Sequence, residues 1–353
     1  MMTDRENFLR TVEFRGPRWI TCTVGLSPGT WQKYREDLEA VAIRHPLIFG
    51  DIRKGSIDFD AMPPTYGKGE KFTDNWGVLW ENAHGGIEGI PVGHPLADWD
   101  KLDTFTPPDP LVKAERADRP DWESTAQRIH SAKQHGRIFW AGGERFFERL
   151  HFLRGYENLM IDFAMDDPHL SRLIDMVIQH NTTLLEKWAS LKPDVIWMGD
   201  DLGTQSALMV SPAMWRKYLL PGYQKLFKIV RDSGAHCYFH CDGNILEIID
   251  DLIDAGVTIL NPQVGANGLD NLVKMCKGRV CVNLDLDRQN ILPFGSPQEV
   301  RDHVREVVEK FGSPSGGLMI FGECQPNVPL ANIEALCQAM EQFQLVNIGI
   351  NRN

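Results

Sequence analysis

Short apolar runs alternate with stretches of helical pattern along this chain, and this alternation limits the fold more than any other feature. The runs are continuous, which is typical of parallel strands buried on both faces. Eight runs lie at residues 19–24, 46–50, 137–141, 195–199, 235–240, 258–261, 280–284 and 318–321. Strands that alternate with helices predict an α/β protein with a parallel sheet, and eight such units would close into a (β/α)8 TIM barrel.

The length allows one domain to contain all eight units. A barrel needs about 250 residues, and up to about 400 with insertions, so a single domain over residues 1–353 is expected. Two smaller domains would also fit this length. An open, doubly wound sheet is the alternative. It is disfavoured because no G-x-G-x-x-G motif follows the first run.

The predicted helices carry clear end signals. Ser296 precedes a proline and stands three residues before Glu299, which is a capping box. Ser211 and Asp167 also precede prolines, and they predict helices that run to about residues 230 and 191. Gly256 follows an apolar stripe at helical spacing and is expected to end that helix.

Residues 52–119 break the rhythm and form a long insertion after the second predicted strand. The segment is rich in Pro, Gly and Trp, and residues 74–81 could pair with residues 94–102 as local structure. Long ordered insertions in barrels often serve as lids or as oligomer contacts. A covering segment without chemistry is an equal alternative.

Charge and cysteine content restrict the partners and the cellular location that can be expected. A net charge of −11 and a pI of about 5.5 argue against nucleic acid or anionic membranes as partners. No apolar run reaches the length of a membrane span, and the N-terminus shows no signal-peptide core. A cytoplasmic location is therefore expected. The seven cysteines are odd in number and contain no C-x-x-C pair, so free thiols are predicted.

Polar side chains follow most predicted strands at the carboxyl end, where barrels build their active sites. In chain order they are Asp51, Glu148, Asp200 with Asp201 and Gln205, His240 with Asp242, Asn261 with Gln263, Asp285, and Glu323 with Cys324. Loops are polar in any protein, which explains part of this pattern but less of its excess of acids. Carboxylates that converge on one cavity repel one another unless a metal or a cationic ligand lies among them.

His240 is the natural metal candidate in this group. Asp242, two residues on, lies on the same side of an extended chain. Glu323 or Cys324 would complete a set of nitrogen, oxygen and sulfur ligands that suits Zn²⁺. The competing interpretation is a histidine that only forms hydrogen bonds within the site, which is the commoner role of a lone histidine.

The neighbours of these residues have their own expected roles. Cys241 alternates to the opposite face of the strand and is expected to be packed away. Asp200 and Asp201 are adjacent, so only one of them is expected to lie fully in the site. The other is expected to cap a helix or to bind backbone.

Several segments together resemble the uroporphyrinogen decarboxylase superfamily, which includes the decarboxylase of haem biosynthesis and corrinoid-dependent methyltransferases. They are RENFLRTVEFRGP (5–17), GDDLGTQSALMVSPAMW (199–215), FHCDGNILEIIDDLIDAGVTILNPQ (239–263), LPFGSPQEV (292–300) and QPNVPLANIEAL (325–336). The resemblance extends over nearly the whole chain. It implies a (β/α)8 barrel and a homodimer.

The match to the haem-pathway enzyme is incomplete. That decarboxylase carries an arginine-rich loop after its first strand, whereas residues 23–34 here contain no arginine. Asp51 matches the acidic residue that stabilises the pyrrole nitrogens, but the tyrosine of the third-strand loop has no clear counterpart. Uroporphyrinogen is therefore not the expected substrate, since an acidic rim would repel its many carboxylates.

The match to the methyltransferase branch is also altered. Those enzymes hold zinc with a His-x-Cys pair and a later cysteine. Here His240 matches the histidine, Asp242 replaces the first cysteine, and Gly322 stands at the last position beside Glu323 and Cys324. The chain has no D-x-H-x-x-G corrinoid-binding motif, so a corrinoid would have to arrive on a partner protein.

Three hypotheses follow. The leading one is a methyltransferase that moves a methyl group from a small methylated or methoxylated donor to a separate corrinoid protein, with zinc or a protonated acid activating the leaving atom. The second is a decarboxylase for another carboxylated substrate, with Asp51 and His240 as its principal groups. The third is a small-ligand or corrinoid-partner binding protein without enzymatic activity.

The residue assignments of the leading hypothesis cover metal, catalysis and substrate. The metal ligands would be His240 and Asp242 with Glu323 or Cys324; the catalytic residues Asp51, Glu148, Asp201, His240 and Asp285; and the substrate-binding residues Gln205, Asn261 and Gln263.

Overall fold

The computed structural model describes residues 2–63 and 66–345. The chain divides into two compact units, which we describe separately. The first unit contains Met1–Lys68, Ala83–Glu88 and Ile259–Asn353, and the second contains Gly69–Asn82 and Gly89–Thr258. A single domain over residues 1–353 stays a prediction. Among the described residues, no helix combines the length and apolar character that a membrane span requires.

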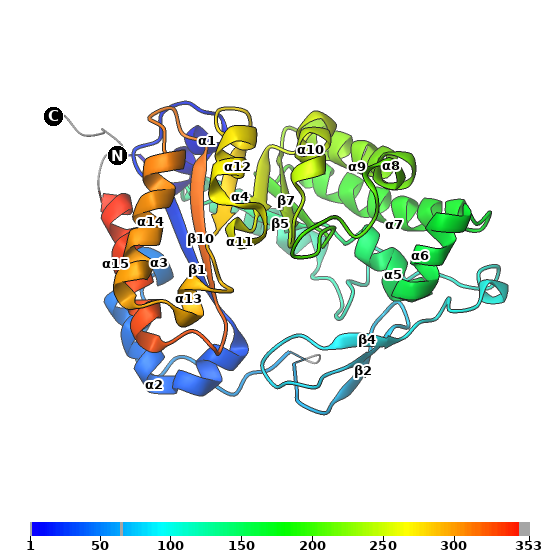
Figure 1. Ribbon diagram of the computed structural model, residues 1–353, viewed down its shortest axis with the longest axis horizontal. Helices are drawn as coiled ribbons and strands as arrows, with labels where there is room; N and C mark the ends of the chain where they lie inside the picture. Colours follow the sequence, from blue (N-terminus) through cyan, green and yellow to red (C-terminus); the bar gives the residue numbers. More distant parts are fainter. Residues whose placement is uncertain (1, 64–65, 346–353) are drawn as a thin grey trace. The chain divides into compact units, whose positions relative to one another are not determined.

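Four parallel strands form the sheet of the first unit, in the order β1 (Thr21–Leu26), β10 (Leu318–Cys324), β9 (Cys281–Asp285) and β8 (Ile259–Pro262). Its helices are α1 (Asp4–Val12), α2 (Pro28–Arg44), α3 (Pro46–Phe49), α11 (Val264–Asn267), α12 (Leu269–Cys276), α13 (Ile291–Phe294), α14 (Pro297–Phe311) and α15 (Leu330–Leu345). Figure 1 shows α14 in orange beside α15 in red, and α15 packs on β1 and β10.

The second unit contains two sheets. Parallel strands β5 (Trp140–Gly142), β6 (Val195–Gly199) and β7 (His236–Cys241) form one, and antiparallel strands β2 (Lys71–Thr73), β3 (Leu79–Glu81) and β4 (Ile90–Gly93) form the other. The helices are α4 (Trp122–Gln134), α5 (Phe147–Arg154), α6 (Tyr156–Met165), α7 (Leu170–Leu191), α8 (Pro212–Met214), α9 (Leu220–Asp232) and α10 (Ile249–Ala255). Short 3₁₀ turns lie at Trp99–Lys101 and Leu246–Ile248, and a π-helical turn joins α8 to α9 at Trp215–Leu219. Figure 1 places α7, α8 and α9 together in green.

Seven of the eight apolar runs form the parallel strands, each within three residues of the expected ends. The α/β class and the parallel strands are therefore confirmed. Three of these strands are buried almost throughout: every residue of β8 is buried, and only one of β6 and one of β9 is partly exposed. β1 and β5 each have one buried residue. Burial on both faces is what continuous apolar runs predict.

The strand predicted at residues 46–50 is wrong, because this segment forms the short helix α3. Pro46 occupies the first helical turn, where its missing N–H is not needed. Gly50 ends the helix with a φ of 74°. None of the four helical residues is buried, and Leu47 is 49% exposed. The apolar run thus lacks the burial that a central strand would have.

Most predicted helix ends are confirmed. Ser296 and Glu299 form a capping box at the start of α14, Ser211 caps α8, and Gly256 ends α10. The start predicted at Asp167 is wrong, because α7 begins at Leu170. The Asp167 carboxylate instead accepts a hydrogen bond from the backbone N–H of His169, at 2.8 Å.

Part of the 52–119 insertion is the antiparallel sheet of the second unit. Residues 79–81 pair with residues 71–73 and 90–93, so the predicted pairing with residues 94–102 is wrong. The reason is that the latter segment is held by α5: His94 Nδ1 lies 2.8 Å from the carbonyl oxygen of Phe152, and Leu96 donates its N–H to Leu153. A role as lid or oligomer contact stays a prediction.

The cysteines belong to the packed interior. All seven are buried free thiols, as predicted. Burial raises the pKa of Cys22, Cys237 and Cys281 above its usual range, which keeps these thiols protonated and unreactive.

Candidate active site

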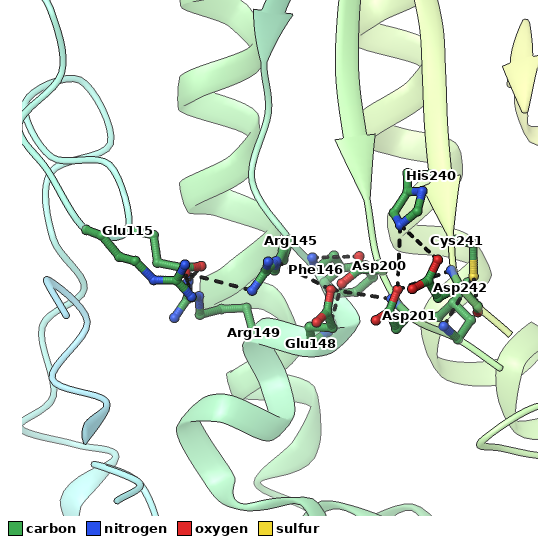
Figure 2. Close-up of polar contacts among 12 residues, drawn as sticks. Glu115, Arg145, Phe146, Glu148, Arg149, Asp200, Asp201, His240, Cys241 and Asp242 are labelled. Carbon is green, nitrogen blue, oxygen red and sulfur yellow. Dashed lines mark hydrogen bonds and ion pairs between the residues drawn. The ribbon is translucent and has the colours of Figure 1, made fainter. Parts of the chain in front are cut away.

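The carboxyl ends of β6 and β7 bring three polar side chains of the second unit together. The strands are in register with Gly199 opposite His240, and the N–H of Asp200 bonds to the carbonyl of His240. His240 Nε2 lies 3.2 Å from Asp242 Oδ1 and 4.0 Å from Asp201 Oδ1. Figure 2 shows the imidazole directed at both carboxylates. We call Asp201, His240 and Asp242 the triad.

The backbone of the two strand ends is locked by glycines. Gly243 has a φ of 80°, and a Cβ there would lie 2.1 Å from the carbonyl oxygen of Gly203. Asn244 donates its N–H to Thr204 at 2.7 Å, which fastens the same two loops together. Only glycine permits this approach, so the close packing of the loops fixes the strand ends that carry the triad.

Asp201 is tied to both of its neighbours. The N–H of Asp242 donates to Asp201 Oδ1 at 3.1 Å, and the N–H of Asp201 donates to Glu148 Oε2 at 3.4 Å. Burial, and then the negative charge of Asp242, raise the pKa of Asp201. A cation between Asp201 and Asp242 would remove this repulsion.

Asp200 plays a different part from Asp201. Its carboxylate is 1% exposed and accepts the N–H groups of Phe146 and Glu148 at the start of α5, together with the hydroxyl of Tyr223 at 2.6 Å. Burial raises its pKa to about 6 in spite of these bonds. The expectation that one of the two aspartates binds backbone is therefore confirmed, and it is Asp200.

Glu148 lies on α5 beside the triad. Arg145 Nε is 3.4 Å from Glu148 Oε2. Burial raises the pKa of Glu148 to about 8; the Arg145 guanidinium opposes this shift, and the carboxylates of Asp201 and Asp200 add to it. A carboxyl group in such surroundings is typical of functional sites.

An ion-pair network continues from Glu148 away from the triad, as Figure 2 shows. Arg145 lies 3.8 Å from Glu115, and Glu115 also pairs with the fully buried Arg149. Arg149 reaches Asp74 at 3.4 Å, in the turn between β2 and β3. Sequence reasoning missed Glu115, Arg149 and Asp74. Arg145 and Glu148 form an i, i+3 ion pair that the local sequence does indicate, but it does not point to Glu115 or Asp74.

The triad meets the geometric requirement for a metal site. One ligand atom from each of Asp201, His240 and Asp242 lies within 4.8 Å of the others. One imidazole nitrogen and two carboxylate oxygens suit Zn²⁺ and other divalent transition metals, and three protein ligands leave a position for substrate or water. The donor set therefore fits a metal ion.

Two of the predicted metal ligands, Glu323 and Cys324, belong to the first unit. Glu323 pairs with Arg288 and accepts a hydrogen bond from the amide of Gln325. Cys324 is fully buried, and burial raises the pKa of its thiol above the usual range. Their roles as metal ligands stay predictions.

The remaining predicted residues occupy varied positions. Asp51 lies exposed after α3, rather than at the end of a strand, and Gln205 lies exposed on the loop after β6.

Asp285 is fully buried on β9, with Arg288 at 3.6 Å. Asn261 and Gln263 are buried at the end of β8, and Asn261 donates to the carbonyl of Asn283. Their roles in substrate binding and catalysis stay predictions.

Comparisons with known proteins include a family match and a structural match that extends over nearly the whole chain. The family model described as uroporphyrinogen decarboxylase (URO-D) matches residues 151–343. A solved methyltransferase from Methanosarcina mazei aligns over 97% of this chain and 99% of its own, with a TM-score of 0.68 and 17% identity. This identity shows a shared fold and nothing further. A search of curated proteins returned no match.

More distant structural matches are weaker. A D-psicose 3-epimerase aligns over 64% of this chain and 84% of its own, with a TM-score of 0.39 and 12% identity. A chitinase from Chromobacterium violaceum aligns over 67% of this chain and 88% of its own, with a TM-score of 0.39 and 9% identity.

Proposed function

We propose, since the chain belongs to the uroporphyrinogen decarboxylase family, that it is a methyltransferase. It takes a methyl group from a small methylated or methoxylated donor and passes it to the cobalt of a corrinoid that a separate protein carries. The observation that carries this proposal is the triad of Asp201, His240 and Asp242. The fold shared with the methyltransferase from Methanosarcina mazei supports it.

The triad would hold the metal ion, and Zn²⁺ is the ion we propose. When bound, such an ion would supply Lewis-acid activation of the atom that leaves when the methyl group departs. His240 and Asp242 belong to the ligand set expected from the sequence, and Asp201 takes the third place that Glu323 or Cys324 was expected to fill. A set without sulfur favours donors whose leaving atom is oxygen or nitrogen.

The surrounding residues position the triad. Glu148 accepts the N–H of Asp201, and Arg145 pairs with Glu148, so both fix the backbone from which Asp201 extends. The arginine pairs of Glu115 anchor α5 on the side away from the triad. We propose that this arrangement keeps Asp201 within reach of the metal before substrate binds.

The architecture and assembly are part of the same proposal. The described residues contain seven parallel strands, and we propose that they belong to a (β/α)8 barrel. We propose that the barrel closes, that the protein forms a homodimer, and that the insertion at residues 52–119 serves as a lid or as a dimer contact. Light scattering of the purified protein tests the dimer directly.

Metal analysis tests the central claim. Purified protein should contain about one zinc per chain, and His240→Ala and Asp242→Asn should lose it. Asp254→Asn is the matched control, since Asp254 is an exposed aspartate of the same unit outside the site. Transfer of methyl groups to cob(I)alamin from a panel of methyl ethers and amines then identifies the donor.

The same measurements define failure. Folded protein that contains no metal and gains no activity with added zinc would contradict the proposal. Decarboxylation of another carboxylated compound would then be the function to test, with Asp51 and His240 as the first residues to substitute.

A further inference from the structure

The parallel sheet of the second unit has two unlike faces, since successive side chains of a strand point to opposite sides. One face is closely packed against α9, where the ring of Phe239 contacts Tyr223 and Phe227. The residues of this face are each at most 2% exposed: Ala141, Ile196, Met198, Cys237, Phe239 and Cys241. This side of the sheet belongs to the packed interior, so a ligand would have to bind on the other side.

The other face carries large aromatic side chains. Gly142, Trp197 and Tyr238 are register partners on β5, β6 and β7. Trp140 stands two residues before Gly142 and so points to the same side. The rings of Trp140 and Tyr238 meet edge to face, with centroids 5.3 Å apart and planes at 78°. We call Trp140, Trp197 and Tyr238 the aromatic wall.

The aromatic wall leads to the triad. Gly199 is the register partner of His240. A Cβ at Gly199 would lie 2.9 Å from Cζ2 of Trp197 and 3.2 Å from Cβ of His240. The indole therefore lies over Gly199 and beside the imidazole, with ring centroids 6.5 Å apart and planes within 19° of each other. A molecule bound on the wall would lie next to the triad.

The wall is only partly covered by the protein. Trp140 is 43% exposed, Gly142 is exposed and Trp197 is partly exposed. A Cβ added at Gly142 would meet no atom within 4 Å, so open space lies over the strand there. The φ of Gly142 is not positive, so its backbone does not require glycine. An exposed indole beside open space is a suitable place for the apolar part of a ligand.

The chemistry of the leaving atom limits the class of methyl donor. Activation by a metal ion requires a lone pair on that atom. A quaternary ammonium nitrogen has no lone pair, whereas an ether oxygen has two. An aryl group on the oxygen makes it a better leaving atom, because a phenol is a much stronger acid than an aliphatic alcohol. An aryl group is also what an aromatic wall binds best, through stacked and edge-to-face contacts.

We propose that the aromatic wall binds the ring of an aryl methyl ether, and that this ether is the methyl donor. In the transfer, the bond between the ether oxygen and the methyl carbon breaks, and two electrons of the corrinoid's cobalt(I) form the new bond to carbon. The oxygen leaves as a phenolate, which takes a proton from water. The role as donor rests on the proposed methyltransferase function; the binding of the ring does not.

Three probes test the preference for an aromatic ring. Methoxyphenol carries the ring, methoxycyclohexanol carries the same substituents on a saturated ring, and choline carries a methylated ammonium group without a ring. Calorimetric titration of the full-length protein should show methoxyphenol binding at least about tenfold more tightly than either of the others. Tenfold corresponds to about 1.4 kcal/mol.

Two variants locate the binding site. Trp140→Leu removes the ring but keeps an apolar side chain, and it should lower the affinity for methoxyphenol about tenfold, with a smaller loss for methoxycyclohexanol. Tyr156→Leu is the matched control, since Tyr156 is 44% exposed on α6 of the same unit, and it should change neither affinity. Gly142→Val fills the open space and should weaken both probes about tenfold.

The melting temperature of each variant, compared with that of the parent, shows whether a loss reflects unfolding. Gly142→Val removes no contact of the parent protein, so it still tests the site if Trp140→Leu is unstable.

Several outcomes would overturn the inference. They are equal affinity for methoxyphenol and methoxycyclohexanol, tighter binding of choline, unchanged affinity in Trp140→Leu or Gly142→Val, or an equal loss in Tyr156→Leu. Methyl transfer from aliphatic donors alone would also contradict it, while supporting the proposed function. Failure of that function looks different: methoxyphenol binds as described, but no methyl group reaches cob(I)alamin from any donor.

Discussion

Each unit has a cluster of carboxylates at strand ends, and the two clusters differ in the base that faces them. In the second unit, Asp201 and Asp242 face the imidazole of His240. In the first unit, Asp285 and Glu323 face the guanidinium of Arg288. Both arrangements place one basic side chain between two acids.

The two bases differ in whether they can lose a proton and then bind a metal ion. An imidazole is neutral in one of its states and then offers a lone pair to a metal, whereas a guanidinium always keeps its charge and has no lone pair to offer. The triad can therefore exchange a proton for a metal ion. The Arg288 cluster already holds its cation in the guanidinium itself.

Removal of a triad ligand should have the largest effect. His240→Ala should lower methyl transfer by about a thousandfold or more, because a bound metal contributes several kcal/mol to the transition state and each 1.4 kcal/mol is about tenfold in rate. A chelator should cause the same loss in the parent protein, and added zinc should restore it. Initial rates of cob(I)alamin methylation measure all three.

Cobalt substitution sharpens this result, because it reports the ligand atoms. Protein loaded with Co²⁺ should lack the thiolate-to-cobalt charge-transfer band if Asp201 is the third ligand. Cys324→Ser should then keep its metal. A thiolate band that disappears in Cys324→Ser would instead restore Cys324 as a ligand and would contradict the role of Asp201.

Much of the fold could be predicted from the sequence because buried segments can be recognised there as apolar runs. Seven parallel strands are continuous apolar runs, and the capping box of Ser296 and Glu299 is a local pattern. The run at residues 46–50 was wrongly predicted as a strand, because hydrophobic periodicity does not distinguish a strand from a short helix. Pro46 and Gly50 at its ends were the better guide.

The site was harder to predict because its contacts join distant parts of the chain. Sequence reasoning found His240 and Asp242 from their spacing, and it found Asp201 as a strand-end acid. It could not choose Asp201 as the third member of the triad, since that depends on the register of β6 against β7. Arg149 and Asp74 are 75 positions apart, and no periodic pattern links them.

Arg288→Gln tests the always-charged guanidinium that faces the carboxylates of the first unit. The substitution leaves the fully buried Asp285 without its nearest guanidinium, so unfolding free energy should fall by about 3 kcal/mol. Arg305→Gln is the control, because Arg305 and Asp302 form a half-exposed pair that should contribute less than about 1 kcal/mol. Urea denaturation measures both. Metal content should stay at the parent level in both variants; loss of metal in Arg288→Gln alone would break the distinction between the clusters.

Asp200 and Asp201 allow the smallest and most local test. Substitution of Asp200 should mainly lower stability, whereas substitution of Asp201 should mainly lower metal content. Asp200→Asn replaces a buried acceptor of two N–H groups and of the Tyr223 hydroxyl, so unfolding free energy should fall by about 2 kcal/mol. Asp201→Asn should cost less than about 0.5 kcal/mol, since its side chain is 39% exposed. Metal content should show the reverse order, with Asp201→Asn depleted and Asp200→Asn retained. If both variants lose metal and stability together, the assignment of a structural role to Asp200 and a metal-binding role to Asp201 is wrong.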